Sequence, residues 1–364
     1  MPSERHRWLA LTTAAFGGRG GIAQYNRDFL TALAGNGGAA SISVMVRQGP
    51  DPIVLSGSIE QAPARAGQLP YALTAAVAAL RRPVDAVFCG HLHMAALAAA
   101  IARWNSAKLI VQMHGIEAWR PPSRLRRAAV ESADLVLCVS RHTRARVLEW
   151  AAIAPERAVV LPNTVGDAFI AGEAQRLRAE MGLSERRVLL TVGRLDARER
   201  YKGQDRVIAA MPALVAEGRD LVYLIAGEGD DEARLRHLAR EAGVADRVRF
   251  LGAVEPARLA SLYRLADLFV MPSTDEGFGI AYLEAMASGT PALGLAAAGA
   301  VDALADGELG TLVSESELAA AIARLLEAPG RDGAALSAAV RARFGRPAFA
   351  ACLGAALGRI GLAA

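Results

Sequence analysis

Short apolar runs alternate with helical patterns along the whole chain. In the first half, strands are predicted over residues 8–12, 42–46, 84–89, 108–113, 135–139 and 159–161. In the second half, they are predicted over residues 188–192, 221–226, 248–251, 268–271, 291–293 and 311–313. Because helical patterns lie between these strands, the repeated βα units predict parallel sheets with helices on both faces.

The helical patterns have one apolar face, as a helix packed on a sheet requires. The first of them places on that face Ile22, Tyr25, Phe29, Leu30 and Leu33. Residues 162–184 open with a proline and an asparagine and predict a hinge. The predicted fold class is therefore α/β, with two doubly wound Rossmann-like domains, residues 1–165 and 185–345, that face each other across a cleft. Ligands of such domains bind at the carboxyl ends of the strands.

Composition narrows the class of protein. Of the 364 residues, 53% are hydrophobic, which is enough for two cores. No apolar run approaches the roughly 20 residues of a membrane-spanning helix. The charged start, residues 1–7, is a poor secretory signal, so a cytoplasmic location is expected. The cysteines at positions 89, 138 and 352 are too widely spaced to predict a disulfide framework or a metal pair.

A glycine-rich loop, residues 17–21, separates the first predicted strand from the first helix. Gly20 and Gly21 would let the backbone approach a phosphate at the start of the helix. The loop also fits a loose dinucleotide-binding pattern, although the next strand ends in Arg47 and Gln48 rather than in an acid. A purely structural turn is an equally good interpretation.

Two histidine motifs follow strands. His114 comes directly after the strand 108–113 and would lie at the edge of the cleft, or else cap or pack a helix. His91 and His93 follow the strand 84–89 and could bind a metal. No cysteine or carboxylate lies near them in the sequence to complete such a site, so no metal is expected.

Arg194 and Lys202 flank one loop after the first strand of the second domain. Two cations so placed can hold a diphosphate and neutralise it as a leaving group. The alternative is a pair of solvated surface cations. Lys108 and Lys202 are the only lysines among 41 basic residues, which favours a chemical role for Lys202.

The segment 272–291 carries the most informative motif. After a strand, it continues with Glu276, Gly277, Phe278, Gly279 and Ile280 and enters a short helix. The N–H groups of residues 278–280 suit a diphosphate or sugar hydroxyls. Glu276 can accept hydrogen bonds from a sugar, and Glu284, within the helix, from a ribose. The alternative, an amphipathic helix with a capping glutamate, leaves the Gly-Phe-Gly loop unexplained.

Together these motifs resemble the nucleotide-sugar glycosyltransferases of the GT-B fold, specifically family 4, over essentially the whole chain. The resemblance rests on motifs that occur in family order: Gly20-Gly21, His114-Gly115, Asn163 in Leu-Pro-Asn, Gly193-Arg194 with Lys202-Gly203, the 226–229 turn, and Glu276 followed by Glu284. One departure is the alanine-rich segment 295–302, where many relatives have polar residues before the glycine.

The resemblance implies a metal-independent, retaining transfer of a hexose from a GDP- or UDP-sugar, with no further cofactor. The acceptor would be a saccharide or a lipid-linked saccharide in bacterial surface polysaccharide or glycolipid assembly. His114 and Glu276 would form the reaction centre. The donor would be bound by Gly20, Gly21, Arg194, Lys202, Gly277, Phe278, Gly279, Ile280 and Glu284. The last segment, 346–364, would form a helix that packs back on the first domain.

Two other classes of function stay open on the residues alone. An NAD(P)-dependent oxidoreductase would bind its cofactor at the glycine loop, with Arg47 at the 2′-phosphate. A non-catalytic GT-B scaffold would not need an intact active site.

A basic cluster, Arg120, Arg124, Arg126 and Arg127, suggests contact with the anionic inner face of the cytoplasmic membrane. A solvated helix face is the alternative, and no nucleic-acid-binding motif accompanies the charge.

Overall fold

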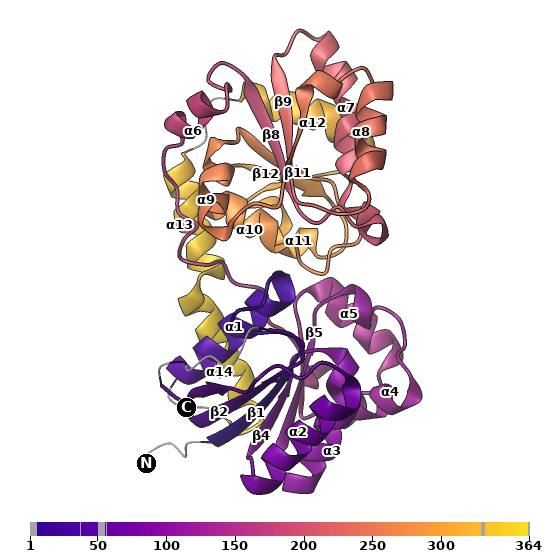
Figure 1. The fold of residues 1–364 in the computed structure, drawn as a ribbon, viewed down its shortest axis with the longest axis vertical. Helices are drawn as coiled ribbons and strands as arrows, with labels where there is room; N and C mark the ends of the chain where they lie inside the picture. The colour runs from indigo at the N-terminus through magenta and orange to yellow at the C-terminus, as the bar shows by residue number, and fades with distance from the viewer. Residues whose placement is uncertain (1–5, 37, 50–54, 56, 329–331, 363–364) are drawn as a thin grey trace. The chain divides into compact units, whose positions relative to one another are not determined.

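The computed structural model describes residues 6–36, 38–49, 55, 57–328 and 332–362. Most of the charged start, residues 1–5, lies outside the described residues, as do residues 363–364 of the last segment. The chain divides into two compact units (Figure 1). The first comprises Met1–Thr164 and Arg346–Ala364, and the second Val165–Gly345. The segment 166–184 is thus part of the second unit and contains helix α6 (Gln175–Glu180).

The first unit is built on a 7-stranded sheet with the order β3-β2-β1-β4-β5-β6-β7. All neighbouring strands are parallel. The strands are β1 (His6–Thr12), β2 (Ala39–Val46), β3 (Ile59–Gln61), β4 (Ala86–Cys89), β5 (Lys108–Met113), β6 (Leu135–Cys138) and β7 (Ala158–Val160). The chain reverses its direction across the sheet between β1 and β4, and ligands of open parallel sheets bind at such switch points.

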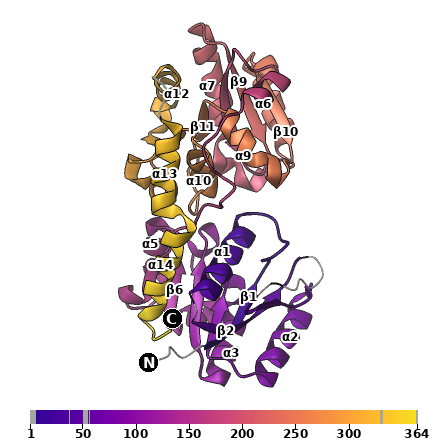
Figure 2. The ribbon, with the colours of Figure 1, turned by 90° about the vertical axis from the view of Figure 1, so that its left-hand side faces the viewer.

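Helices cover both faces of this sheet. One face carries the apolar sides of α2 (Gln68–Arg81), α3 (Ala95–Asn105), α4 (Arg124–Glu131) and α5 (Arg141–Trp150). On the other side, the C-terminal helix α14 (Arg346–Gly358) packs along α1 (Gly21–Gly35), as Figure 2 shows. The ring centroids of Tyr25 and Phe349 lie 5.8 Å apart, and the Asn36 amide donates to the Ala350 carbonyl at 3.2 Å.

The second unit repeats the architecture with a 6-stranded parallel sheet in the order β10-β9-β8-β11-β12-β13. Its strands are β8 (Arg187–Val192), β9 (Leu221–Ala226), β10 (Val248–Gly252), β11 (Leu268–Met271), β12 (Ala292–Leu295) and β13 (Thr311–Val313). The switch point lies between β8 and β11. Arg194 follows the first of these strands and Glu276 the second.

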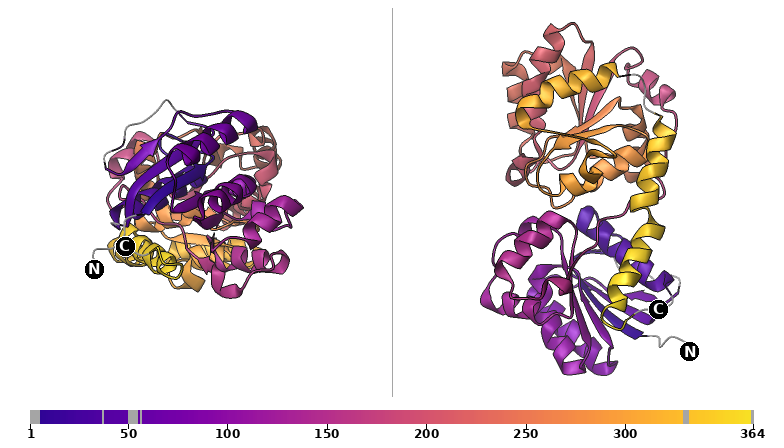
Figure 3. Two further views of the ribbon diagram at one scale, coloured as in Figure 1. Left: turned by 90° about the horizontal axis from the view of Figure 1, so that it is seen from below. Right: turned by 180° about the vertical axis from the view of Figure 1, so that it is seen from behind.

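The helices of the second unit form two groups. One apolar cluster joins the sheet to α7 (Gln204–Ala216), α8 (Glu232–Glu241) and α12 (Leu318–Glu327), and α12 crosses the sheet in the view from behind (Figure 3). The second group is α9 (Pro256–Leu265), α10 (Ile280–Ala287) and α13 (Gly333–Phe344), in which α10 packs against the other two. A short helix, α11 (Ala300–Ala303), follows β12.

The α/β fold class and every predicted strand are confirmed, with ends that differ by at most three residues. Strand β3 was not predicted, because its sequence, Ile-Glu-Gln, has a single apolar residue and lacks the apolar run of the other strands. Helix α1 spans the predicted first helix and buries Tyr25, Phe29, Leu30 and Leu33. None of the helices in the described part of the chain has the length and hydropathy that crossing a bilayer requires.

Candidate active site

A close backbone approach assembles the switch point of the second unit. The 3-10 helix Ala197–Lys202 leads into α7 through Gly203, whose φ is +80°. A Cβ atom at Gly203 would lie 2.4 Å from the carbonyl oxygen of Pro272, in the loop after β11. Only a glycine therefore lets these two loops meet. Their meeting places Lys202 next to Glu276.

Lys202 and Glu276 form a nearly buried ion pair. The Lys202 Nζ donates to Glu276 Oε1 at 2.7 Å and lies 3.8 Å from Glu199 Oε2. The two paired side chains are 14% and 12% exposed. Burial lowers the pKa of Lys202, but the charges of Glu276 and Glu199 outweigh it and leave the pKa above its ordinary value. Lys202 is therefore a cation at neutral pH.

Arg194 shares a carboxylate with Lys202. Its guanidinium pairs with Glu199, and its side chain is 73% exposed. Glu199 was not among the predicted site residues, although its position three residues before Lys202 is the spacing of a helical pair. The two cations are thus balanced by two carboxylates. Both cations have N–H donors beyond these pairs and can bind a further anion.

The Gly-Phe-Gly loop presents backbone donors at the start of α10. Gly279 has a φ of +93°, and a Cβ there would lie 2.6 Å from the Tyr282 ring. Phe278 is 3% exposed and anchors the loop against Phe344, with ring centroids 5.9 Å apart. Among the described residues, no group accepts a hydrogen bond from the N–H of Gly277, Phe278 or Gly279. These donors lie at the positive end of a helix and can bind an anion.

The alanine-rich segment supports this loop through its backbone. The Gly299 N–H donates to the Glu276 carbonyl oxygen at 2.9 Å. A Cβ at Gly299 would lie 2.2 Å from the Gly277 carbonyl oxygen, so a side chain there would displace the loop. The contact depends on the glycine and not on polar side chains before it.

Glu284 lies within α10 and titrates near neutrality. Its Oε2 accepts a hydrogen bond from the Tyr263 hydroxyl at 2.8 Å. Burial raises the pKa of Glu284 to about 7, and the Tyr263 bond offsets only part of that effect. A carboxylate with one internal donor retains capacity for further donors, such as ribose hydroxyls.

In the first unit, the glycine loop is open. Helix α1 begins at Gly21, and Gly20 has a φ of +93°. A Cβ built at either glycine meets no atom within 4 Å, and both residues are exposed. The Arg27 guanidinium holds the preceding turn by donating to the carbonyl oxygens of Ala15 and Gly18. The loop has space for a ligand next to its backbone.

His114 is neutral, and its tautomer is defined. Its Nε2 lies 2.9 Å from the Gly90 carbonyl oxygen, and a carbonyl only accepts, so Nε2 carries the proton. Burial lowers the pKa of His114 to about 4, and the bond to Gly90 opposes that shift only in part. The ring also meets Tyr25 edge-on, with centroids 5.1 Å apart. His114 can therefore accept a proton or hydrogen bond at Nδ1, but it has none to donate there.

The predicted residues fall into two sets. Arg194, Lys202 and the 276–284 motif lie together at the switch point of the second unit. Gly20, Gly21 and His114 follow β1 and β5 in the first unit. Among the described residues, no three His, Cys, Asp or Glu side chains form a group that could hold a metal ion. The rings of His91 and His93 meet edge-on, and the His93 N–H donates to His91 Nδ1 at 3.2 Å.

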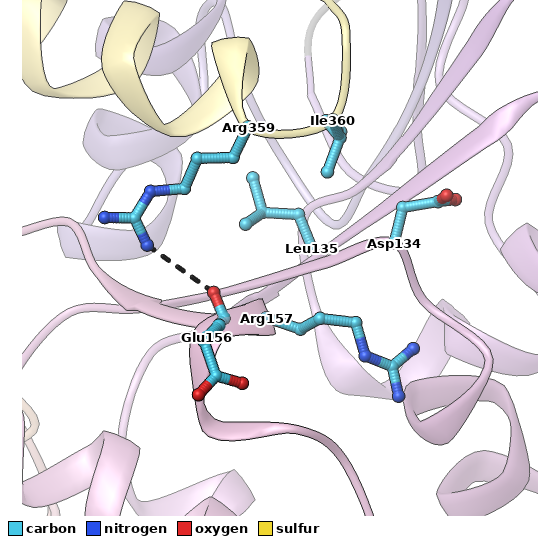
Figure 4. Close-up of a pocket in the computed structure, with 6 residues that line it drawn as sticks. All are labelled: Asp134, Leu135, Glu156, Arg157, Arg359 and Ile360. Carbon is cyan, nitrogen blue, oxygen red and sulfur yellow. Dashed lines mark hydrogen bonds between the residues drawn. The ribbon is translucent and has the colours of Figure 1, made fainter.

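A hollow of about 470 Å³ lies elsewhere in the first unit (Figure 4). Its lining residues are Asp134, Leu135, Glu156, Arg157, Arg359 and Ile360. The Arg359 guanidinium reaches toward the Glu156 carbonyl at 3.5 Å. The hollow adjoins the amino ends of β6 and β7, opposite the edge where ligands of parallel sheets bind. None of the predicted site residues lines it.

Known proteins with similar sequences are glycosyltransferases. D-inositol 3-phosphate glycosyltransferase 2 of Catenulispora acidiphila is 35% identical over 61% of this chain and 55% of its own length. The GDP-mannose-dependent alpha-(1-6)-phosphatidylinositol monomannoside mannosyltransferase of Mycolicibacterium smegmatis is 34% identical over 69% of each chain. This chain thus spans about half the length of the first relative and about two thirds of the second.

Solved structures share the fold. Sucrose-phosphate synthase from Thermosynechococcus elongatus has a TM-score of 0.79 and 25% identity, over 97% of this chain and 99% of its own. Anabaena HepE in complex with UDP-glucose has a TM-score of 0.78 and 19% identity, over 97% and 100%. Residues 19–168 match the profile of Glycosyltransferase Family 4, and residues 174–343 that of Glycosyl transferases group 1. The chain belongs to glycosyltransferase family 4, and its two Rossmann-like units have the GT-B fold.

Proposed function

We propose that this protein is a glycosyltransferase that moves a hexose from a GDP- or UDP-linked donor to a saccharide or lipid-linked acceptor. The observation that carries the proposal is the pairing of Lys202 with Glu276 at the switch point of the second unit, 2.7 Å apart. Arg194 and the N–H groups of the Gly-Phe-Gly loop lie at the same edge of that sheet.

The diphosphate of the donor binds Arg194, Lys202 and the N–H groups at the start of α10. As the bond between the anomeric carbon and the diphosphate breaks, negative charge grows on the leaving oxygen, and these positive groups stabilise it. They do so without a metal ion, because fixed cations and backbone dipoles supply the charge. Transfer with retention of the anomeric configuration is what the family resemblance implies.

The two carboxylates orient the donor at different points. Once the diphosphate binds Lys202, Glu276 can accept hydrogen bonds from hydroxyls of the reacting sugar. Glu284 accepts from the ribose hydroxyls, beside its bond from Tyr263. His114, which is neutral and held by its hydrogen bond to Gly90, is the residue of the first unit that lies at the reaction centre in this proposal.

The choice of donor and acceptor draws on relatives. One is named for its dependence on GDP-mannose and for a phosphatidylinositol monomannoside acceptor, and a structural neighbour was solved with UDP-glucose. These names support a nucleotide-linked hexose as donor and an acceptor in glycolipid or surface polysaccharide assembly. Membership in family 4 favours a transferase over the oxidoreductase alternative.

The proposal includes peripheral contact with the inner face of the cytoplasmic membrane. Arg120, Arg124 and Arg127 are exposed near Leu125, which is itself 71% exposed. Arg127 also pairs with Glu131 at 2.8 Å, which weakens its contribution. Exposed arginines around an apolar side chain suit an anionic lipid surface.

A ligand panel tests the proposed function. The thermal shift of the purified protein is measured with UDP, GDP, ADP, their sugars and NADPH. We expect one nucleotide and its sugar to stabilise the wild type and to lose that effect in Lys202→Ala. The other lysine, Lys108, pairs with Asp134 at a surface, so Lys108→Ala is the matched control. Stabilisation by NADPH alone, or by no nucleotide sugar, would overturn the proposal.

A further inference from the structure

Two arginines of the first unit lack a partner. Arg47 follows β2, and Arg126 lies in α4; both side chains are partly buried. Among the described residues, neither guanidinium forms an ion pair or donates a hydrogen bond, and the Arg47 Nε is shielded from solvent with no acceptor. By contrast, Arg127 and Arg146 of the same unit both pair with glutamates. The Arg47 Nε is thus a buried donor without an acceptor, and both guanidinium groups have N–H donors left for an external anion.

The fold brings both arginines toward His93. The backbone N–H of Arg47 donates to the Thr13 carbonyl oxygen at 3.1 Å, which fixes the residue beside the carboxyl end of β1. His93 lies in the turn Leu92–Met94 after β4, the strand on the other side of β1. Helix α4, with Arg126, packs against that same turn. The three side chains therefore come from separate elements around the switch point of the first sheet.

Electrostatics agree with this placement. Burial lowers the pKa of His93, and the charges on Arg126 and Arg47 lower it further. Glu117 is the carboxylate that opposes this effect, and it already accepts from the His114 N–H at 2.6 Å. His93 is thus exposed, and two arginines without an ion-pair partner among the described residues favour its neutral form.

We propose that Arg47, His93 and Arg126 form an anion-binding subsite that holds a phosphate group of the acceptor. The inference rests on the proposed function and deepens it by naming a phosphorylated acceptor as the substrate class. Guanidinium groups bind phosphate oxygens in pairs, and a neutral imidazole adds one donor. The subsite belongs to the first unit, whereas the cations proposed for the donor diphosphate belong to the second. His91 links it to His114, because the centroids of these two rings are 6.1 Å apart.

Binding of inorganic phosphate to the full-length protein tests the subsite. All variants carry Lys202→Gln, which removes the donor cation proposed above as a second phosphate site. We expect Arg47→Gln/Arg126→Gln to bind phosphate at least fivefold more weakly than Lys202→Gln alone, and R47K/R126K to be intermediate. Arg103, exposed on α3, provides the matched control Arg103→Gln, which should leave phosphate binding unchanged. Equal binding by the glutamine double variant and by Lys202→Gln alone would overturn the proposal. Circular dichroism establishes that each variant is folded.

Two further probes distinguish the sources of the phosphate. One is inositol 1-phosphate, a soluble phosphomonoester; the other is a vesicle of 20% phosphatidylinositol in phosphatidylcholine. If the glutamine double variant loses mainly the binding of inositol 1-phosphate, the acceptor is a soluble phosphomonoester. If it loses mainly the binding of the vesicles, the acceptor phosphate belongs to a lipid. If neither probe distinguishes the variant from the wild type, the acceptor assignment is wrong. The thermal-shift panel of nucleotide sugars tests the proposed function independently of this subsite. If the protein binds phosphate at the subsite but responds to no nucleotide sugar, the proposed function is wrong and the anion-binding subsite stands.

Discussion

Lys202 and Glu276 are 74 positions apart in the chain, yet Nζ and Oε1 are joined by a hydrogen bond of 2.7 Å. The cation expected to hold the diphosphate and the carboxylate expected to hold the sugar are therefore direct partners. An ammonium group has three N–H donors and a carboxylate has several acceptor sites, so each group can also bind a donor molecule. The pair would then place a cation and a carboxylate at adjacent parts of one donor, which is the geometry that orienting a sugar diphosphate requires.

Replacing the cations should reduce transfer unequally. We expect Lys202→Ala to lower kcat/KM by about 30- to 1,000-fold, because a nearly buried cation at a developing charge is worth roughly 2–4 kcal/mol. Arg194 is 73% exposed, so Arg194→Ala should cost less, about 1–2 kcal/mol. Steady-state kinetics on the folded variants measure both. Unchanged efficiency in both variants would remove the diphosphate assignment.

Replacing Glu276 and replacing Glu284 should affect different kinetic parameters. Glu276→Gln should mainly lower kcat, by about 100-fold, because the sugar must be held while charge develops at its anomeric carbon. Glu284→Gln should mainly weaken donor binding, by about 1.5–3 kcal/mol, because the ribose does not react. Glu241, exposed on α8, gives the control Glu241→Gln. Small and equal effects of the first two variants would mean that the motif only stabilises the helix.

Donor binding should strengthen as the pH rises through 7. Burial holds the pKa of Glu284 near 7, above the ordinary value of 4.5, so the free protein keeps the carboxyl protonated below that pH. Ribose hydroxyls donate to the ionised form, so binding lowers this pKa and releases a proton. Below pH 7 the Kd of a nucleotide sugar should rise by up to about tenfold per pH unit. Calorimetry at pH 6 and pH 8 measures the difference, and a variant Glu284→Gln that keeps the same pH dependence would contradict it.

His114 should remain neutral across the working pH range. Burial lowers the pKa of His114 to about 4, and the hydrogen bond to the Gly90 carbonyl keeps the proton on Nε2. Nitrogen NMR of the side chain should therefore show one neutral tautomer from pH 8 down to pH 5.5. An imidazolium signal with a midpoint above pH 6 would show that the ring is exposed or carries a counter-charge, and it would remove the assigned role of Nδ1 as an acceptor.

Transfer should continue when metal ions are removed. Arg194, Lys202 and the N–H groups of residues 277–279 supply positive charge where many nucleotide-dependent enzymes use a magnesium ion. Activity in EDTA should equal activity in magnesium within a factor of about two. If EDTA abolishes transfer and Mg²⁺ or Mn²⁺ restores it, the cations of the protein are not sufficient, and the proposed charge balance at the leaving group is wrong.

Local patterns in the sequence were sufficient to predict the strands, helix α1 and the loop before α10. Buried positions recur at a regular spacing along a strand or along one face of a helix, so they can be recognised in the sequence. A glycine with a positive φ, such as Gly279, marks a turn that involves only the neighbouring residues. Strand β3 was not predicted because its sequence, Ile-Glu-Gln, lacks an apolar run. Glu199 was not predicted as a site residue, although its spacing from Lys202 is visible in the sequence.

Tertiary structure alone decided which side chains that are distant in the sequence form hydrogen bonds and ion pairs. Lys202 meets Glu276 because β8 and β11 are neighbours in the sheet, and Glu284 meets Tyr263 because α10 packs against α9. The elements that carry Arg47, His93 and Arg126 are neighbours for the same kind of reason, around strands that are adjacent in space but not in sequence. Sequence periodicity reports which face of an element is buried, whereas strand order and helix packing determine what that face and its loops contact.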